Sequence, residues 1–190
     1  MFGVLIPGTT VPEVPAAAPE QEFIERVISI KRISKVMKGG KRMRISAAVV
    51  VGDGRGRVGL GHGKALEVAA AVSKATVRAR KEMRPVAMKG HTIPHECTGK
   101  YGASRVLVKP AAPGTGLIAC PQVRAVLEAA GLRDALSKVF GSRNHYNTAR
   151  ATIRALATLR TLEQVAAARN KPIHHLVERD RYEAPESYTG

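Results

Sequence analysis

Seven basic residues fall within fourteen consecutive positions, 31–44, and no acidic residue interrupts them. Side chains of this type and spacing bind phosphate groups, because a polyanion relieves the repulsion among the cations and releases its own counterions. A solvated basic edge strand that only discourages aggregation is the alternative. A Gly-Gly pair between two β-prone runs predicts a hairpin turn, with the cations on its tip and stem. The residues expected to bind this partner are Lys31, Arg32, Lys35, Lys38, Gly39, Gly40, Lys41, Arg42 and Arg44.

A glycine-rich stretch over residues 52–64 contains Gly54, Gly56 and Gly59 in the pattern G-x-G-x-x-G. A dinucleotide-binding loop needs its last glycine to open a helix, yet helical pattern here begins only at Ala65, and no acidic residue follows about 20 positions on. The P-loop pattern also fails, because Val58 stands where glycine is required and Ala65 where Ser or Thr is required. A nucleotide-dependent enzyme is therefore not expected.

The later glycines of this stretch, Gly59, Gly61 and Gly63, recur with period two and so share one face of a strand. A face without side chains lets another backbone come close. That backbone is either an RNA sugar-phosphate chain or a packed helix, and the sequence leaves both open. Three cations in and after the stretch are placed to hold phosphates: Arg55, Arg57 and Lys64.

Catalytic and metal-binding arrangements are absent from the sequence. His91, His95 and Cys97 lie close together, but Pro94 prevents the two histidines from sharing a helix face, and there is no C-x-x-C pair. No nucleophile, base and orienting group occur at a sensible spacing. We expect no enzyme activity, no metal, no cofactor and no small-molecule substrate. Two cysteines, Cys97 and Cys120, make no disulfide framework and fit a reducing cytoplasm.

The whole chain is strongly basic, since 31 Lys and Arg residues outnumber 15 Asp and Glu residues and give a net charge of +16. A surplus of this size indicates a nucleic acid or an anionic membrane as partner. No basic amphipathic helix carries Trp or Phe on its other face, and no run reaches about 18 apolar residues, so the membrane is disfavoured. With no Trp, three Phe and four Tyr, base stacking cannot dominate. Phosphate and sugar contacts must carry the binding to RNA.

The first part of the chain predicts three strands and a helix. β-branched residues indicate a strand from Phe23 through the thirties, a second from Met43 to Val51 and a third from Val58 to Gly63. An alanine-rich helix follows and stops before Pro85. We expect Leu66, Ala69, Val72 and Val77 to face the sheet, and Lys74, Arg78 and Lys81 to form a basic stripe on the other side.

The second part predicts further strands and helices, with the clearest strand from Ser104 to Lys109. Pro121 suits the first turn of a helix and Gly131 its C-terminal cap. The remaining expected elements are a short strand over 132–139, a helix over 148–159, and a short helix that Thr161 caps. The fold class is therefore α+β, with tails at 1–21 and 178–190 and two folded units at 22–84 and 85–177.

Several long motifs in unbroken order resemble one family. They are "SKVMKGGKRMR", "VVGDGRGRVGLGHGKALEVAAAVSKA", "GKYGASRVLVKPAAPGTGLIA", "VRAVLEAAGLRDALSKVFGS" and "TARATIRAL". Together they are similar to the bacterial small-subunit ribosomal protein five family, over roughly residues 22–177. The resemblance implies a double-stranded-RNA-binding-like first domain of three strands and a helix. It also implies a left-handed β-α-β second domain, a departure from the usual right-handed crossover.

The same resemblance implies a role without catalysis. Such a protein binds small-subunit rRNA at the joint of head and body and lines the channel through which mRNA enters. It also contacts the fourth and eighth small-subunit ribosomal proteins, and it supports decoding accuracy. Gly114, Gly116 and Arg124 would lie at the contact with the fourth protein. This chain departs from the family at Ala119 to Gln122, where a Gly-Gly pair is common, and at His145, where proline is common. A free-standing double-stranded RNA binder outside the ribosome is the alternative.

Overall fold

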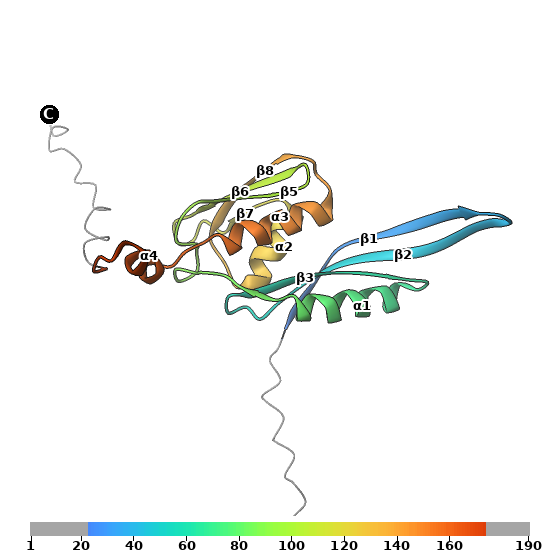
Figure 1. Cartoon of the computed structure of the whole chain (residues 1–190), viewed down its shortest axis with the longest axis horizontal. Coiled ribbons are helices and arrows are strands. Elements are labelled where there is room, and N and C mark those ends of the chain that lie inside the picture. The colour runs from blue at the N-terminus through green and yellow to red at the C-terminus, as the bar shows by residue number, and fades with distance from the viewer. Residues whose placement is uncertain (1–22, 174–190) are drawn as a thin grey trace, which may run out of the picture.

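The computed structural model describes residues 23–173, so the tails expected at 1–21 and 178–190 lie outside the described residues. The first sheet has the order β1-β2-β3-β4 and is antiparallel throughout. Its strands are β1 (Ile24–Met37), β2 (Gly40–Gly52), β3 (Arg57–Ala65) and β4 (Arg84–Pro85), and α1 (Val68–Lys81) covers one face (Figure 1). The three expected strands are confirmed, whereas the two-residue β4, which pairs with Arg57 and Val58, was not predicted.

The β1–β2 hairpin extends far beyond the rest of this sheet (Figure 1). β3 pairs with β2 only between Ile45 and Gly52. Residues 40–44 of β2 pair only with β1, from Ile33 to Met37, and have no partner in β3. The two-residue loop places Gly39 at φ +89°, a backbone conformation that favours glycine. In the described part of the chain, the distal hairpin therefore projects as a two-stranded ribbon with no further strand or helix packed against it.

The glycine face of β3 packs against α1. A Cβ atom on Gly61 would overlap the carbonyl oxygen of Ala75, and Gly59 and Gly63 meet Ala79 and Ala71 in the same way. Of the two open interpretations of these glycines, close packing of a helix is the one the structure contains. Of the four residues expected to face the sheet, Val72 packs against the cluster beneath α1, but the expectation is wrong for Leu66, Ala69 and Val77. Leu66 comes before α1 begins, and its side chain is 77% exposed. Ala69 and Val77 lie on α1 but are exposed, because the small residues Ala71, Ala75 and Ala79 make the close contact with β3.

The second sheet has the order β5-β6-β8-β7. Its strands are β5 (Cys97–Tyr101), β6 (Ser104–Pro110), β8 (Ala135–Gly141) and β7 (Leu117–Ile118). β7 runs parallel to β8, and α2 (Pro121–Ala130) connects them, which makes a β-α-β unit. The predicted bounds of α2 are confirmed, with Pro121 in the first turn and Gly131 in the left-handed conformation at φ +93°.

Two helices complete this part of the chain. α3 (His145–Ala157) begins three residues earlier than predicted, because the side chain of Asn144 accepts a hydrogen bond from the Tyr146 amide and caps it. α4 (Leu162–Arg169) begins at the expected cap, where Thr161 and Gln164 form a capping box. No helix within residues 23–173 is both long and apolar enough to cross a membrane.

The elements stack in four layers: α1, the first sheet, the pair α2 and α3, and the second sheet (Figure 1). One apolar cluster runs through the inner layers and joins Val50 and Leu60 of the first sheet to Leu127 and Val106. The amides of Gly54 and Gly56 donate to the carbonyl oxygens of Ala129 and Ala130 over 3.1 and 2.9 Å. The β2–β3 turn is therefore tied to the end of α2, and the two parts of the chain share a core.

Candidate nucleic-acid interface

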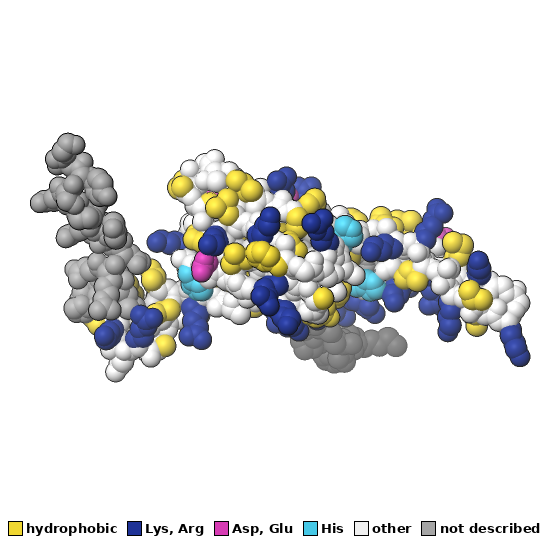
Figure 2. All heavy atoms as spheres, turned by 90° about the horizontal axis from the view of Figure 1, so that it is seen from above, with side chains coloured by type: hydrophobic (Ala, Val, Ile, Leu, Met, Phe, Trp, Pro, Cys, Tyr) yellow, Lys and Arg dark blue, Asp and Glu magenta, His cyan; other side chains and the backbone are white. Residues whose placement is uncertain are grey.

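Among the described residues, the seven cations of the hairpin have no acidic partner. All seven residues are exposed, and within residues 23–173 none of their side chains makes an ion pair or a hydrogen bond. Figure 2 shows Lys and Arg side chains along the length of the hairpin. Lys35 lies directly opposite Arg42 in the ladder. Like charges in this position destabilise a strand pair, so the hairpin is built in a way that an anionic partner would stabilise.

The register distributes these cations over both faces of the ribbon. Side chains of residues that are paired in a ladder point to the same face, and successive residues alternate. One face carries four cations and continues the sheet face that looks towards α2 and α3; the opposite face carries Arg32 and Lys41. The four are Lys31, Lys35, Arg42 and Arg44. The hairpin thus presents positive charge on both of its faces.

Lys64 joins this surface, whereas Arg55 and Arg57 do not. Lys31, Ser46 and Lys64 stand side by side on three neighbouring strands. Arg55 and Arg57 lie in or next to the β2–β3 turn, where their amides donate to the carboxylate of Asp53 over 2.9 and 2.8 Å. That turn is at the other end of β2 from the hairpin tip, roughly 40 Å away at about 3.3 Å per residue. The three cations that the sequence grouped together therefore lie in two places: Lys64 near the hairpin stem, and Arg55 and Arg57 at the far turn.

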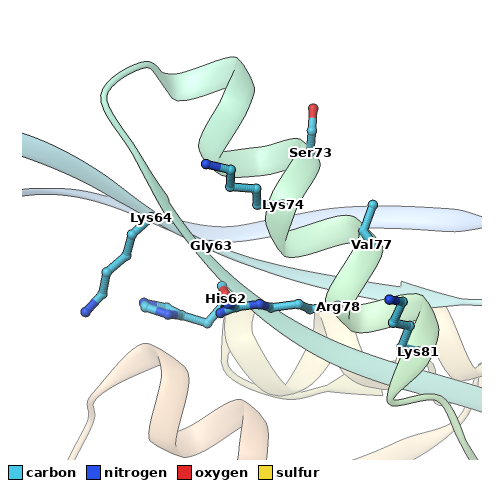
Figure 3. A pocket seen from close by; sticks show the side chains of 8 residues that line it. All are labelled: His62, Gly63, Lys64, Ser73, Lys74, Val77, Arg78 and Lys81. Atoms are coloured by element: carbon cyan, nitrogen blue, oxygen red, sulfur yellow. Dashed lines mark hydrogen bonds between the residues drawn. The ribbon is translucent and has the colours of Figure 1, made fainter.

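A basic hollow along the outer edge of β3 was missed as a site. His62, Gly63 and Lys64 of β3 line it together with Lys74, Arg78 and Lys81 of α1 (Figure 3). The guanidinium of Arg78 donates to the carbonyl oxygen of His62 over 2.8 Å. The helical spacing of Lys74, Arg78 and Lys81 was the signal, but the sequence could not show that this stripe lies beside Lys64.

His62 sits where the hairpin, β3 and α3 meet. Its Nε2 is 2.6 Å from the hydroxyl of Ser46, and its ring meets the Tyr146 ring edge-on at 5.5 Å. Partial burial lowers the pKa of His62, and the nearby charges of Lys64 and Arg78 lower it further. The imidazole is therefore biased towards its neutral form in the free protein, and an anion beside it would reverse that bias.

The three expected protein-contact residues lie around one loop. The carboxylate of Asp134 accepts hydrogen bonds from the amides of Gly114 and Gly116 over 3.1 and 2.8 Å. Arg124 of α2 donates to the carbonyl oxygen of Leu117 over 3.1 Å. Both glycines have positive φ, which lets the loop turn its amides inward. Asp134, only 8% exposed, organises this loop and was not recognised from the sequence.

The histidine and cysteine cluster serves packing and loop geometry. Nδ1 of His95 lies 2.8 Å from the carbonyl oxygen of Glu96, and its Nε2 accepts from the Arg160 amide at 3.2 Å. Cys97 is buried, and burial raises the pKa of its thiol to about 11. No group of three or more potential metal ligands occurs within residues 23–173.

Two family models cover most of the described chain. "Ribosomal protein S5, N-terminal domain" matches residues 23–87, and "Ribosomal protein S5, C-terminal domain" matches residues 99–169. The chain belongs to the ribosomal protein S5 family. The expected resemblance is thereby confirmed, and so is the absence of enzyme activity, because ribosomal protein S5 is structural and non-enzymatic.

Relatives in the S5 family match along nearly their whole length. Proteins named small ribosomal subunit protein uS5 from Chloroflexus aurantiacus and Thermosynechococcus vestitus are 48% and 50% identical over 158 residues. These matches cover 83% of this chain and 89% and 91% of the relatives. The uS5 protein of Lawsonia intracellularis is 49% identical over 152 residues, which cover 80% of this chain and 93% of that protein.

Proposed function

We propose that this ribosomal protein is a structural component of the small ribosomal subunit that binds small-subunit rRNA through the β1–β2 hairpin. The observation that carries the proposal is the projecting ribbon whose cations have no acidic partner within residues 23–173, above all Lys35 opposite Arg42. Repulsion in the free hairpin makes phosphate neutralisation favourable. The names of the uS5 relatives support the same assignment to the small subunit.

The proposed contacts on RNA are of two kinds. Lys38, Gly39, Gly40, Lys41 and Arg42 form the tip that enters a narrow space between RNA segments, and Lys31, Arg32, Lys35 and Arg44 line the stem. Lys64 extends the stem surface onto β3. Arg55 and Arg57, at the far turn, would meet a different part of the RNA.

The finer role follows from the family resemblance. The protein would stabilise the joint of head and body, line the channel through which mRNA enters, and support decoding accuracy. The loop with Gly114 and Gly116, together with Arg124, would contact the fourth small-subunit protein, and the eighth would be a further neighbour. Residues 22–84 would form the double-stranded-RNA-binding-like domain and residues 85–177 the second domain, with a left-handed crossover from β7 through α2 to β8.

Sedimentation of cell extract on a sucrose gradient, followed by a wash in about 0.5–1 M salt, tests the proposal. The chain should sediment with the small subunit and stay there through the wash. A chain that runs free, or washes off readily, would instead be a double-stranded RNA binder outside the ribosome.

A further inference from the structure

A hollow of about 450 Å³ lies between the start of α2, the strand β8 and the start of α3. Its volume is within the range of small-ligand pockets, about 300–1,000 Å³. We name it the cysteine hollow, because it holds the partly exposed thiol of Cys120. Cys120 and Gln122 line it from the start of α2, Lys138 from β8, and Arg143, His145 and Thr148 from the turn into α3.

The two stretches at which the chain departs from the family pattern meet in the cysteine hollow. Cys120 and Gln122 belong to the first stretch, and His145 is the second. The amide nitrogen of Gln122 donates a hydrogen bond to Nδ1 of His145, although 23 positions separate the two residues in the chain. The departures therefore form one local structure, and the thiol of Cys120 is its nucleophilic group.

The cysteine hollow is positively charged. Lys138 and Arg143 are exposed, and within residues 23–173 their side chains make no ion pair. No acidic side chain belongs to the described lining of the hollow, and the first turn of α2 carries none. Because a helix N-terminus also bears a positive partial charge, the surroundings of Cys120 attract an anionic reagent.

Buried hydroxyl groups in the lining point to a ligand. Thr148 is 1% exposed, and its Oγ1 has no hydrogen-bond partner in the described part of the chain. Oγ of Ser137, which also lines the hollow, is in the same state. A buried hydroxyl without a partner destabilises the folded chain, so a ligand with amide or carboxylate groups gains affinity by bonding to it.

We propose that Cys120 forms a mixed disulfide with a small anionic thiol, whose carboxylates bind Lys138 and Arg143 and whose amide groups bind the Thr148 hydroxyl. The thiol of Cys120 gives its proton to water, and the thiolate attacks one sulfur of the corresponding disulfide. A new S–S bond forms to Cys120 as the S–S bond of the reagent breaks. The electron pair of the broken bond leaves with the second sulfur, which takes a proton from water. Cys120 is thereby oxidised, and the released half of the reagent is reduced.

The other cysteine does not compete for this reagent. Cys97 is only 5% exposed, and burial raises the pKa of its thiol to about 11. Since the thiolate is the reacting form, Cys97 is protected both by its low exposure and by its high pKa.

The charge of the reagent tests the hollow. The reduced full chain is treated with glutathione disulfide, which is anionic, or with bis(2-hydroxyethyl) disulfide, which is neutral, and peptide mass spectrometry follows the rate at each cysteine. The same chain unfolded in urea gives the intrinsic rates. The ratio of the anionic to the neutral rate at Cys120 should be about three- to tenfold higher in the folded chain. An equal ratio, or no glutathione adduct at Cys120, overturns the proposal.

The variant Lys138→Gln/Arg143→Gln assigns the effect to the two cations. It should slow the reaction with glutathione disulfide about three- to tenfold and leave the reaction with the neutral disulfide unchanged. The matched control, Lys89→Gln/Lys100→Gln, removes the same charge at exposed positions outside the hollow and should leave both rates near those of the unaltered chain. If the control slows the anionic reagent as much, net charge alone explains the rates and the proposal fails.

Thr148→Val tests the bound adduct. The equilibrium constant for the mixed disulfide is measured in buffers of reduced and oxidised glutathione. This constant should fall about two- to tenfold, because the adduct loses one hydrogen bond, whereas thermal unfolding should show that the reduced variant is no less stable. Thr148→Ser retains the hydroxyl and should keep the constant near that of the unaltered chain. An unchanged constant in Thr148→Val would overturn the role of this hydroxyl in the site.

Discussion

Lys35 and Arg42 face each other across the β1–β2 ladder, and no acidic side chain among the described residues pairs with either. Cross-strand pairs contribute roughly 0.2–1 kcal/mol, and like charges contribute unfavourably. The free hairpin is therefore less stable than its strand length suggests. This pair links the stability of the isolated protein to its binding, because the same charges oppose one and favour the other.

Lys35→Gln should consequently leave the free energy of unfolding unchanged or raise it by up to about 0.5 kcal/mol. The same substitution should weaken rRNA binding. It should also make the fall of log K with log salt shallower, by about 0.7–0.9 in the magnitude of the slope. Denaturant unfolding and binding titrations at several salt concentrations measure the two effects on one variant. Loss of stability together with unchanged binding would show that Lys35 has a packing role instead.

Gly61→Ala tests the contact between β3 and α1. The added methyl group would overlap the Ala75 carbonyl oxygen, and a backbone group cannot rotate away. Overpacking of this kind destabilises by about 1–3 kcal/mol or more. Thermal unfolding should show a large fall in Tm.

Gly39→Val is the contrast, because a side chain there meets nothing within 4 Å and only the positive φ is strained. Its loss should be confined to the hairpin and seen mainly in RNA binding.

Asp134→Ala should loosen the loop that carries Gly114 and Gly116. Two amides lose a charged acceptor, and a hydrogen bond to a charged group contributes about 1.5–3 kcal/mol. Hydrogen exchange at these two amides should become faster, and the protein should be less stable to denaturant. Asp134→Asn retains an accepting oxygen, so its exchange rates and its stability should lie between those of the unaltered chain and of Asp134→Ala. Unchanged exchange in the alanine variant would mean that the loop holds its shape without Asp134.

Cys97 predicts a loss of stability at alkaline pH. Its pKa in the folded protein is about 11, above the usual value near 9, because the thiolate is disfavoured by burial. The unfolded thiol therefore loses its proton first, and this contribution is intact below about pH 9 and is lost as pH rises towards about 11. Denaturant unfolding across this range should show a steeper fall in the free energy of unfolding for the unaltered chain than for Cys97→Ala.

A thiol reagent near pH 8 should modify the partly exposed Cys120 before Cys97. Equal rates at both would contradict the burial.

The titration of His62 should report whether an anion occupies the basic hollow along the outer edge of β3. Its pKa lies below the ordinary 6.5 in the free protein, so its stabilising contribution is present above that value and lost as pH falls below it. A phosphate bound in this hollow should raise the pKa of His62, because a nearby negative charge favours the imidazolium form. NMR titration of His62 with and without rRNA fragments measures the change, with Lys74→Gln/Lys81→Gln as control. The titratable or charged groups around the ring are Lys31, Lys64, Arg78 and Tyr146.

Features that depend only on neighbouring residues could be predicted before the fold was known. Turn geometry and capping act within a few residues, so three features were predictable from local sequence. They are the glycine turn between two basic strands, the helix from Pro121 to Ala130 that ends at Gly131, and the cap at Thr161. The concentration of charge between positions 31 and 44 is equally local. These signals were enough to predict the hairpin and its polyanionic partner.

Which surfaces meet could be learned only from the folded chain. The period-two glycines are compatible with RNA or a helix, and it is the packing of Ala71, Ala75 and Ala79 that assigns them to α1. Ala69 and Val77 of α1 are exposed as a result, although periodicity had placed them against the sheet. The strand register placed Lys64 on the same sheet face as Lys31, with Ser46 between them, and carried Arg55 to the other end of the sheet. Each of these outcomes depends on contacts between residues far apart in the chain, whose free energies no local pattern contains.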